Sequence, residues 1–161
     1  MSNVLQKVAF LDRDGTLIYE PPDTKQVDSL EKLRVLPGVI SVLNRLSEQG
    51  FMLVMVSNQD GMGTDTFPRA DFELVQQKLL NDLKENGIVF ARVFICPHFE
   101  TDNCICRKPK TGLLKEFLAS IWIDMEQSFV LGDSLSDAEL AQNIGIPFYA
   151  VQTNSIFPNI L

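Results

Sequence analysis

Short apolar segments alternate along this chain with longer amphipathic segments, and this alternation limits the fold more than any other feature. Five segments are almost continuously apolar and have the length of strands: Val8–Leu11, Phe51–Val56, Val89–Ile95, Phe129–Leu131 and Phe148–Val151. Between them, apolar residues recur at helical spacing within residues 37–50, Ala70–Asn86, Gly112–Trp122 and Ser136–Ile144. Buried strands separated by helices predict an α/β fold with a doubly wound, mostly parallel sheet. We expect Trp122 and the other aromatic side chains to fill core positions.

Length and charge narrow the class of protein further. A chain of 161 residues favours one domain over residues 1–161, with no large cap domain. A net charge of −7 argues against a general nucleic-acid surface, which needs clustered Lys and Arg. The apolar runs have strand length rather than membrane-span length, and the start MSNVLQKVAF lacks the apolar core of a signal peptide, so we expect a cytoplasmic protein. The oligomeric state stays open.

Small polar residues follow the predicted strands at the points where those strands end. Asp12 and Asp14 follow the first strand, Ser57 and Asn58 follow the second, and Asp133 follows the fourth. Each piece alone is compatible with a turn or a helix cap. Together they would meet at the carboxyl edge of a parallel sheet, where ligands collect beside the topological switch point. Carboxylates grouped in this way repel one another unless a cation lies among them, and Mg²⁺ is the ion that such oxygen ligands favour.

A second metal site is predicted in the stretch CPHFETDNCIC, which contains all three cysteines and the only histidine of the chain. Cys96, His98, Cys104 and Cys106 have the spacing C-x-H-x5-C-x-C. Three thiolates and one imidazole form a common structural zinc site, with four ligands and no position left for substrate. Free thiols beside an incidental histidine, or a different metal, are the alternatives.

Four motifs in chain order resemble those of the haloacid-dehalogenase (HAD) type of phosphatase, and together they span most of the chain: FLDRDGTLI, VSNQ, RKPK and LGDSLSD. The resemblance implies that Asp12 is the nucleophile that accepts the phosphoryl group. It implies that Asp14 protonates the leaving oxygen and then activates water. It further implies that Mg²⁺ is held by Asp12, the backbone carbonyl of Asp14 and Asp133.

The same resemblance assigns the phosphate contacts. Ser57, with Asn58 beside it, would hydrogen-bond the phosphoryl group, and Lys108 would neutralise its charge. Arg107 precedes Lys108 directly after the predicted zinc loop, so bound zinc would fix the approach of both cations to the phosphate. On chemistry alone, Asp137 competes with Asp14 for the acid/base role.

The zinc loop makes the chain similar to a small branch of these phosphatases, which act on small phosphorylated metabolites. The segments around residues 20–28 and 58–72 look closest to histidinol-phosphate phosphatases of histidine biosynthesis; the alternative is the phosphatase of D-glycero-D-manno-heptose 1,7-bisphosphate. Histidinol phosphate carries an ammonium and an imidazole, which Glu20, Asp23 and Asp28, with Gln26, would meet. The alternative for this acidic stretch is a solvated loop.

Two non-enzymatic alternatives remain at this point. A receiver-type signalling module also has an acidic Mg²⁺ site, but it accepts the phosphoryl group on an Asp after its third strand. In this chain the third predicted strand is followed by Cys96, Pro97 and His98, which offer no acceptor carboxylate. The second alternative is a zinc-binding module whose acidic edge is inert.

Overall fold

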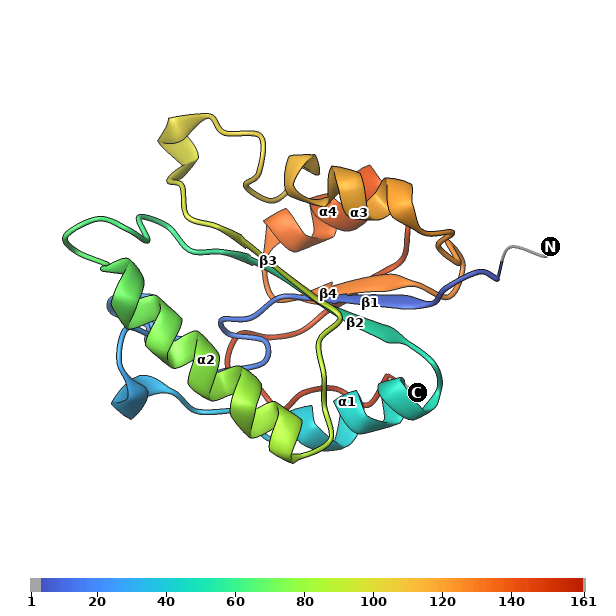
Figure 1. Cartoon of the computed structure of the whole chain (residues 1–161), viewed down its shortest axis with the longest axis horizontal. Helices are drawn as coiled ribbons and strands as arrows, with labels where there is room; N and C mark the ends of the chain where they lie inside the picture. The colour runs from blue at the N-terminus through green and yellow to red at the C-terminus, as the bar shows by residue number, and fades with distance from the viewer. Residues whose placement is uncertain (1–3, 161) are drawn as a thin grey trace.

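The protein is built around a five-stranded sheet in which every strand runs parallel to its neighbours (Figure 1). The structure is a computed structural model, and it describes residues 4–160. The strands are β1 (Val8–Leu11), β2 (Met52–Asn58), β3 (Arg92–Cys96), β4 (Phe129–Gly132) and β5 (Phe148–Ala150). Their order across the sheet is β3-β2-β1-β4-β5. The predicted doubly wound α/β fold is therefore confirmed.

Helices cover both faces of the sheet: α1 (Val39–Glu48) and α2 (Arg69–Glu85) pack on one face, and α3 (Lys115–Ser120) and α4 (Leu135–Ile144) pack on the other (Figure 1). The central strand β1 is completely buried, and its side chains alternate between the two cores. Ala9 and Leu11 pack with α1 and α2, whereas Val8 and Phe10 pack with α3 and α4. The fully buried side chains of Val8, Phe10 and Leu11 each contribute roughly 2 kcal/mol to stability, so β1 is firmly anchored.

Most predicted element boundaries are shifted by one or two residues, and two elements differ by more. Strand β3 begins at Arg92 rather than Val89, because its pairing with β2 starts only at Val54 and Arg92. The helix predicted over residues 112–122 is a 3₁₀ turn followed by the short α3. After α3 the chain is extended at Ile121, and the carbonyl of Trp122 accepts a hydrogen bond from Gln6 N. The Trp122 side chain is 64% exposed, so its predicted core position is wrong.

The strand order places the topological switch point beside β1. From β1 the chain crosses through α1 to β2, which pairs with one edge of β1. Strand β4 pairs with the other edge of β1, and the helix that follows it, α4, lies on the opposite face of the sheet from α1. The carboxyl ends of these three strands thus open into one crevice between the diverging connections.

Within residues 4–160, none of the helices combines the length and the apolar character that crossing a membrane requires.

Candidate active site

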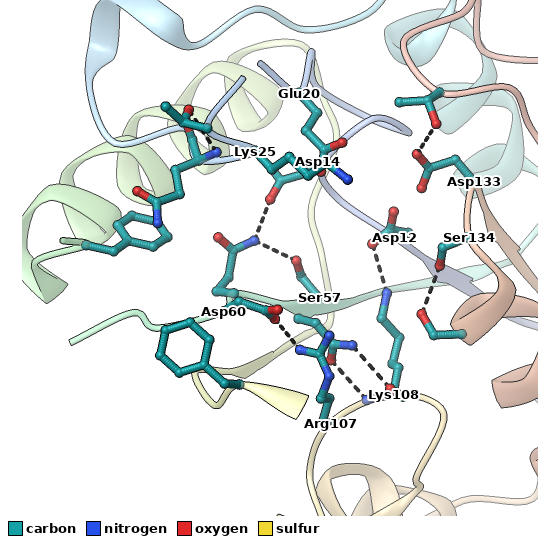
Figure 2. A pocket seen from close by; sticks show the side chains of 18 residues that line it. Asp12, Asp14, Glu20, Lys25, Ser57, Asp60, Arg107, Lys108, Asp133 and Ser134 are labelled. Carbon is teal, nitrogen blue, oxygen red and sulfur yellow. Dashed lines mark hydrogen bonds and ion pairs between the residues drawn. The ribbon is translucent and has the colours of Figure 1, made fainter. Parts of the chain in front are cut away.

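A cavity of about 600 Å³ lies at the carboxyl ends of β1, β2 and β4, and its lining is mostly polar (Figure 2). It brings together most of the residues that the sequence analysis placed in the catalytic, phosphate and substrate site: Asp12, Asp14, Glu20, Gln26, Ser57, Asn58, Arg107, Lys108 and Asp133. These residues come from five separate parts of the chain, so the parallel sheet is what assembles them.

The turn after β1 places the two acidic residues of the first motif. Four backbone hydrogen bonds close this turn between residues 13 and 18. Gly15 has a φ of +78°, and a Cβ atom at this position would overlap the carboxylate of Asp133. Glycine is therefore required here for two reasons: the backbone conformation, and the close approach of the loop after β1 to the loop after β4. The two carboxylates Asp12 and Asp14 are both nearly buried.

Asp12 lies in a chain of buried charges that runs through Lys108 to Asp137. Lys108 Nζ donates to Asp12 Oδ1 at 2.8 Å, to Asp137 Oδ1 at 2.7 Å and to the carbonyl of Val56 at 2.8 Å. All three protons of the ammonium are thus used, which holds Lys108 in one position. Thr16 Oγ1 donates to the other oxygen of Asp12 at 3.1 Å.

These contacts explain how the ionisable groups are tuned. Burial raises the pKa of Asp12 to about 6, although the ion pair with Lys108 acts in the opposite direction. Burial acts to lower the pKa of Lys108, but the charges of Asp12 and Asp137 outweigh it and raise that pKa above its usual value. Burial also raises the pKa of Asp137. Asp137 therefore supports the ammonium, and its contact with Lys108 was not part of the sequence prediction.

Asp14 is held on both sides by residues that the sequence analysis did not single out. Arg13 Nη1 donates to its Oδ1 at 2.8 Å, and Gln59 Nε2 donates to its Oδ2 at 2.6 Å. The same Gln59 nitrogen donates to Ser57 Oγ at 2.8 Å. Both residues lie inside the quoted motifs, but an arginine and a glutamine in loops carry no signal of burial. Only the tertiary fold reveals that they are inaccessible.

Asn58 has a different role from the predicted phosphate contact. Its side-chain amide pairs with the backbone of Lys108, accepting from the N–H at 2.9 Å and donating to the carbonyl at 3.2 Å. The end of β2 thereby fixes the segment that carries the lysine. Asn58 still lines the cavity, but both of its polar atoms are engaged by Lys108.

The carboxylates form a cluster that could hold a divalent cation. One oxygen from each of Asp12, Asp133 and Asp137 lies within 4.8 Å of the others. Both oxygens of Asp137 are already bonded, one to Lys108 and the other to Ser134 at the start of α4. Asp12 and Asp133 line the cavity whereas Asp137 does not, so Asp12 and Asp133 are the side chains that suit a hard cation at this edge. Their carboxylate oxygens fit Mg²⁺.

The predicted Cys₃His group is assembled beyond the end of β3. Its four ligand atoms all lie within 4.8 Å of one another. The sulfurs of Cys96 and Cys104 are 3.7 Å apart, close to the edge of about 3.8 Å expected for a tetrahedral zinc–thiolate site. His98 presents Nδ1, which lies 3.1 Å from the sulfur of Cys106. Burial raises the pKa of the Cys96 thiol to about 12, so ionisation of this group at neutral pH requires a nearby cation.

The Cys/His loop is tied to the loop after β2, which forms another wall of the cavity. Gln59 N donates to the carbonyl of Cys96 at 2.7 Å, and Gly61 N donates to that of Pro97 at 3.0 Å. Arg107 forms an ion pair with Asp60 at the mouth of the cavity (Figure 2). Arg107 was predicted to approach the phosphate; the structure places it at the cavity and engages its charge with Asp60.

Glu20 and Gln26 both line the cavity, on the segment that follows the turn after β1. Burial, followed by the charges of Asp14 and Asp133, raises the pKa of Glu20 to about 7. The backbone of Glu20 is held by the side chain of Asn154, which accepts from its N–H at 2.7 Å and donates to its carbonyl at 2.9 Å.

The other two acidic residues of this segment do not reach the cavity. Asp28 pairs with Lys32 at 2.7 Å, and the Asp23 side chain accepts a hydrogen bond from Thr24 N. Their predicted role beside the substrate is therefore not supported.

Comparisons with known proteins agree with this site. The sequence profile described as polynucleotide kinase 3 phosphatase matches residues 7–153. The histidine biosynthesis bifunctional protein HisB of Campylobacter jejuni subsp. doylei is 54% identical over 141 residues, which make up 88% of this chain and 40% of that protein. HisB of Legionella pneumophila (strain Lens) is 47% identical over 147 residues, or 91% of this chain and 42% of that protein. The chain thus spans about two fifths of the length of these relatives.

A solved structure is similar over nearly the whole fold. The D,D-heptose 1,7-bisphosphate phosphatase from B. bronchiseptica, complexed with magnesium and phosphate, superposes with a TM-score of 0.82 at 30% sequence identity. The similarity covers 92% of this chain and 82% of that protein. The matching profile, these relatives and the carboxylate site at the switch point lead to one conclusion: the chain belongs to the polynucleotide kinase 3 phosphatase family of HAD-like phosphatases.

Proposed function

We propose that this chain is a Mg²⁺-dependent phosphomonoesterase that hydrolyses L-histidinol phosphate to L-histidinol and phosphate. The observation that carries the proposal is the buried pair of Asp12 and Lys108, which lies beside Asp14 in a polar cavity at the switch point. The 54% identity to a bifunctional protein of histidine biosynthesis supports this substrate. It also supports a place for the reaction in histidine biosynthesis.

Hydrolysis proceeds in two displacements at phosphorus. In the first, a carboxylate oxygen of Asp12 bonds to phosphorus while the bond from phosphorus to the substrate's ester oxygen breaks, and Asp14 gives its proton to that oxygen. In the second, Asp14 takes a proton from water, the water oxygen bonds to phosphorus, and the bond to Asp12 breaks. Phosphate leaves, and both aspartates return to their starting protonation states.

The residues around Asp12 lower the barrier by positioning and charge. Lys108 offsets the repulsion between the Asp12 carboxylate and an incoming phosphate dianion, and Asp137 keeps the ammonium in place. Ser57 is the hydroxyl that donates to a phosphoryl oxygen. A bound Mg²⁺, held by Asp12, Asp133 and the carbonyl of Asp14, would supply further positive charge at the phosphoryl oxygens.

Zinc has a structural role in this proposal. Cys96, His98, Cys104 and Cys106 provide four ligands, which leaves no open coordination position for substrate. The loop that they close is hydrogen-bonded to the loop after β2 and leads into Arg107 and Lys108. Zinc would therefore position the cation that faces Asp12 rather than take part in the reaction.

Substrate selection follows from the charges around the cavity. Glu20 and Gln26 offer a carboxylate and an amide to the ammonium and the imidazole of histidinol phosphate. Among the residues that line the cavity, three are cationic, and two of these are already paired: Lys108 with Asp12 and Asp137, and Arg107 with Asp60. Only the third cation, Lys25, would be available to a second phosphate without competition from these carboxylates, which favours a monophosphate.

Heptose 1,7-bisphosphate remains the second candidate substrate because the solved phosphatase with a TM-score of 0.82 acts on it. A receiver-like module is disfavoured, because the two buried aspartates follow β1 whereas β3 ends at Cys96. An inert zinc-binding module is disfavoured by the ordered chain of Asp12, Lys108 and Asp137, which would have no purpose there.

The test is phosphate release from L-histidinol phosphate and from heptose 1,7-bisphosphate at equal concentrations, with and without Mg²⁺. We expect Mg²⁺-dependent release with a preference for histidinol phosphate, and no release by the Asp12→Asn variant. Preference for the heptose would keep the mechanism and replace the substrate. If the zinc-loaded protein released phosphate from neither ester, the proposal would be rejected and the binding-module alternative revived.

A further inference from the structure

We propose that Gln59 is a positioning residue whose single amide group couples the acid/base carboxylate Asp14 to the phosphate-binding hydroxyl of Ser57. The inference rests on the proposed function, because it assumes that these two groups act on a phosphate ester. It assigns to Gln59 the alignment of proton transfer with phosphate binding, a role separate from contact with the substrate.

The hydrogen bonds define which atom of Gln59 does this. Its Nε2 lies 2.6 Å from Asp14 Oδ2 and 2.8 Å from Ser57 Oγ. The NH₂ end of the amide therefore faces both partners. That nitrogen has two protons, and one goes to each partner. No other residue in the described part of the chain hydrogen-bonds to both Asp14 and Ser57.

The position of Gln59 is itself fixed. The residue is 2% exposed, and its backbone N–H donates to the carbonyl of Cys96 at 2.7 Å. Asp14 is held from the opposite side by Arg13, a fully buried arginine whose guanidinium lies 5.0 Å from the centre of the Phe72 ring. A carboxylate with a donor on each oxygen cannot rotate freely, so its remaining lone pairs keep one direction relative to Ser57.

This geometry has a consequence for each partner. Because Ser57 Oγ accepts from Gln59, its own proton is free to point at a phosphoryl oxygen. Because each oxygen of Asp14 retains a further lone-pair site, one of them can carry the proton that passes to the leaving oxygen. Proton transfer of this kind contributes about 100-fold or more to rate, and only when the acid is placed within hydrogen-bond reach.

A purely structural glutamine would have different effects on catalysis. If Gln59 only stabilised the loop after β2, its loss would slow all substrates alike. If it only supported Ser57, phosphate binding would weaken to the same extent for every ester. A role in placing Asp14 predicts instead that the loss depends on whether the leaving group needs a proton.

The experiment compares two esters in the wild type, in Gln59→Met and in Gln76→Met. The leaving group of L-histidinol phosphate is an alkoxide, which must be protonated. The leaving group of p-nitrophenyl phosphate is a stabilised phenolate, which can depart without a proton. Gln76 is a matched control because it is also buried but contacts Met55, away from the cavity. The quantity compared is kcat/KM, which reports steps only up to the first irreversible one and so omits the second use of Asp14.

For Gln59→Met we expect kcat/KM to fall about 100-fold with histidinol phosphate and about 10-fold or less with p-nitrophenyl phosphate. Gln76→Met should keep wild-type values with both. Thermal unfolding of each variant separates loss of folding from loss of positioning. Equal losses with the two esters, or no loss with either, would overturn the positioning role.

The proposed substrate is tested separately by the wild type alone. If the wild type does not hydrolyse histidinol phosphate but does hydrolyse glycerol 2-phosphate, the function proposed above fails. The Gln59 comparison is then made with glycerol 2-phosphate as the alkyl ester. A wild type that hydrolyses no alkyl ester would overturn both.

Discussion

Individual buried charges in the site are stable because each has a partner of the opposite sign or a donor. Lys108 shares its protons between Asp12 and Asp137, and Asp14 accepts from Arg13 and Gln59. Removing one partner from such a pair leaves an uncompensated buried charge, which costs more than the pair itself contributes. The site is therefore sensitive to conservative changes as well as to large ones.

Glu20 gives a prediction at this scale because its pKa is raised to about 7 in the folded protein from 4.5. Between these values the folded state binds more protons at Glu20 than the unfolded state, so this residue makes stability fall as pH rises through that window. In Glu20→Gln this contribution is absent. We expect the variant's thermal midpoint to exceed the wild type's at pH 8 and to differ little at pH 4.5.

Thermal unfolding without added Mg²⁺ measures this difference across the pH range. A suitable control is Glu85→Gln at the end of α2, an exposed position whose effect should not change with pH in the same way. If Glu20→Gln lost stability relative to the wild type on going from pH 4.5 to pH 8, the assignment of a raised pKa would be wrong.

At the scale of elements, two loops act together as one wall of the cavity. The Cys/His loop after β3 and the loop after β2 are joined by hydrogen bonds from Gln59 and Gly61 to the carbonyls of Cys96 and Pro97. A Cβ at Gly61 would overlap the ring of Phe99, so the two loops also pack closely. Any disorder in one loop should pass to the other and to Lys108.

Replacement of Cys104 by Ser tests this coupling, because it removes one ligand of the predicted zinc site. We expect the variant to lose zinc, to unfold at a temperature lower by roughly 5 °C or more, and to have lower activity at saturating Mg²⁺. Metal analysis and thermal unfolding measure the first two effects. Thr101→Ser, an exposed change in the same loop, is the control. A Cys104→Ser protein that was metal-free, fully stable and active would contradict the structural role of zinc.

At the scale of the whole molecule, the sheet order accounts for what sequence patterns could predict. Apolar runs alternating with amphipathic ones determine a parallel α/β fold, and the carboxyl ends of parallel strands must share an edge. Asp12, Asp14, Ser57 and Asp133 could thus be brought together without coordinates. The Cys/His loop was predictable for a different reason: its four ligands lie close together in the sequence.

Other features depend on contacts that no local pattern encodes. The burial of Arg13 and Gln59 arises only when the loops after β1 and β2 meet. Trp122 is exposed, on a segment whose backbone pairs with Gln6, more than a hundred residues away in sequence. Asn58 was expected on the phosphate and instead binds the Lys108 backbone, because the loop after β3 folds back over β2.

The central claim is that a phosphoryl group passes through Asp12, and trapping it there is the most direct test. Zinc-loaded enzyme in excess is mixed with ³²P-labelled L-histidinol phosphate and Mg²⁺, quenched in acid within the first turnover, and digested for peptide mapping. The account predicts transient label on the peptide that contains Asp12, and none in Asp12→Asn. Label on another residue, or undiminished turnover by Asp12→Asn, would contradict it.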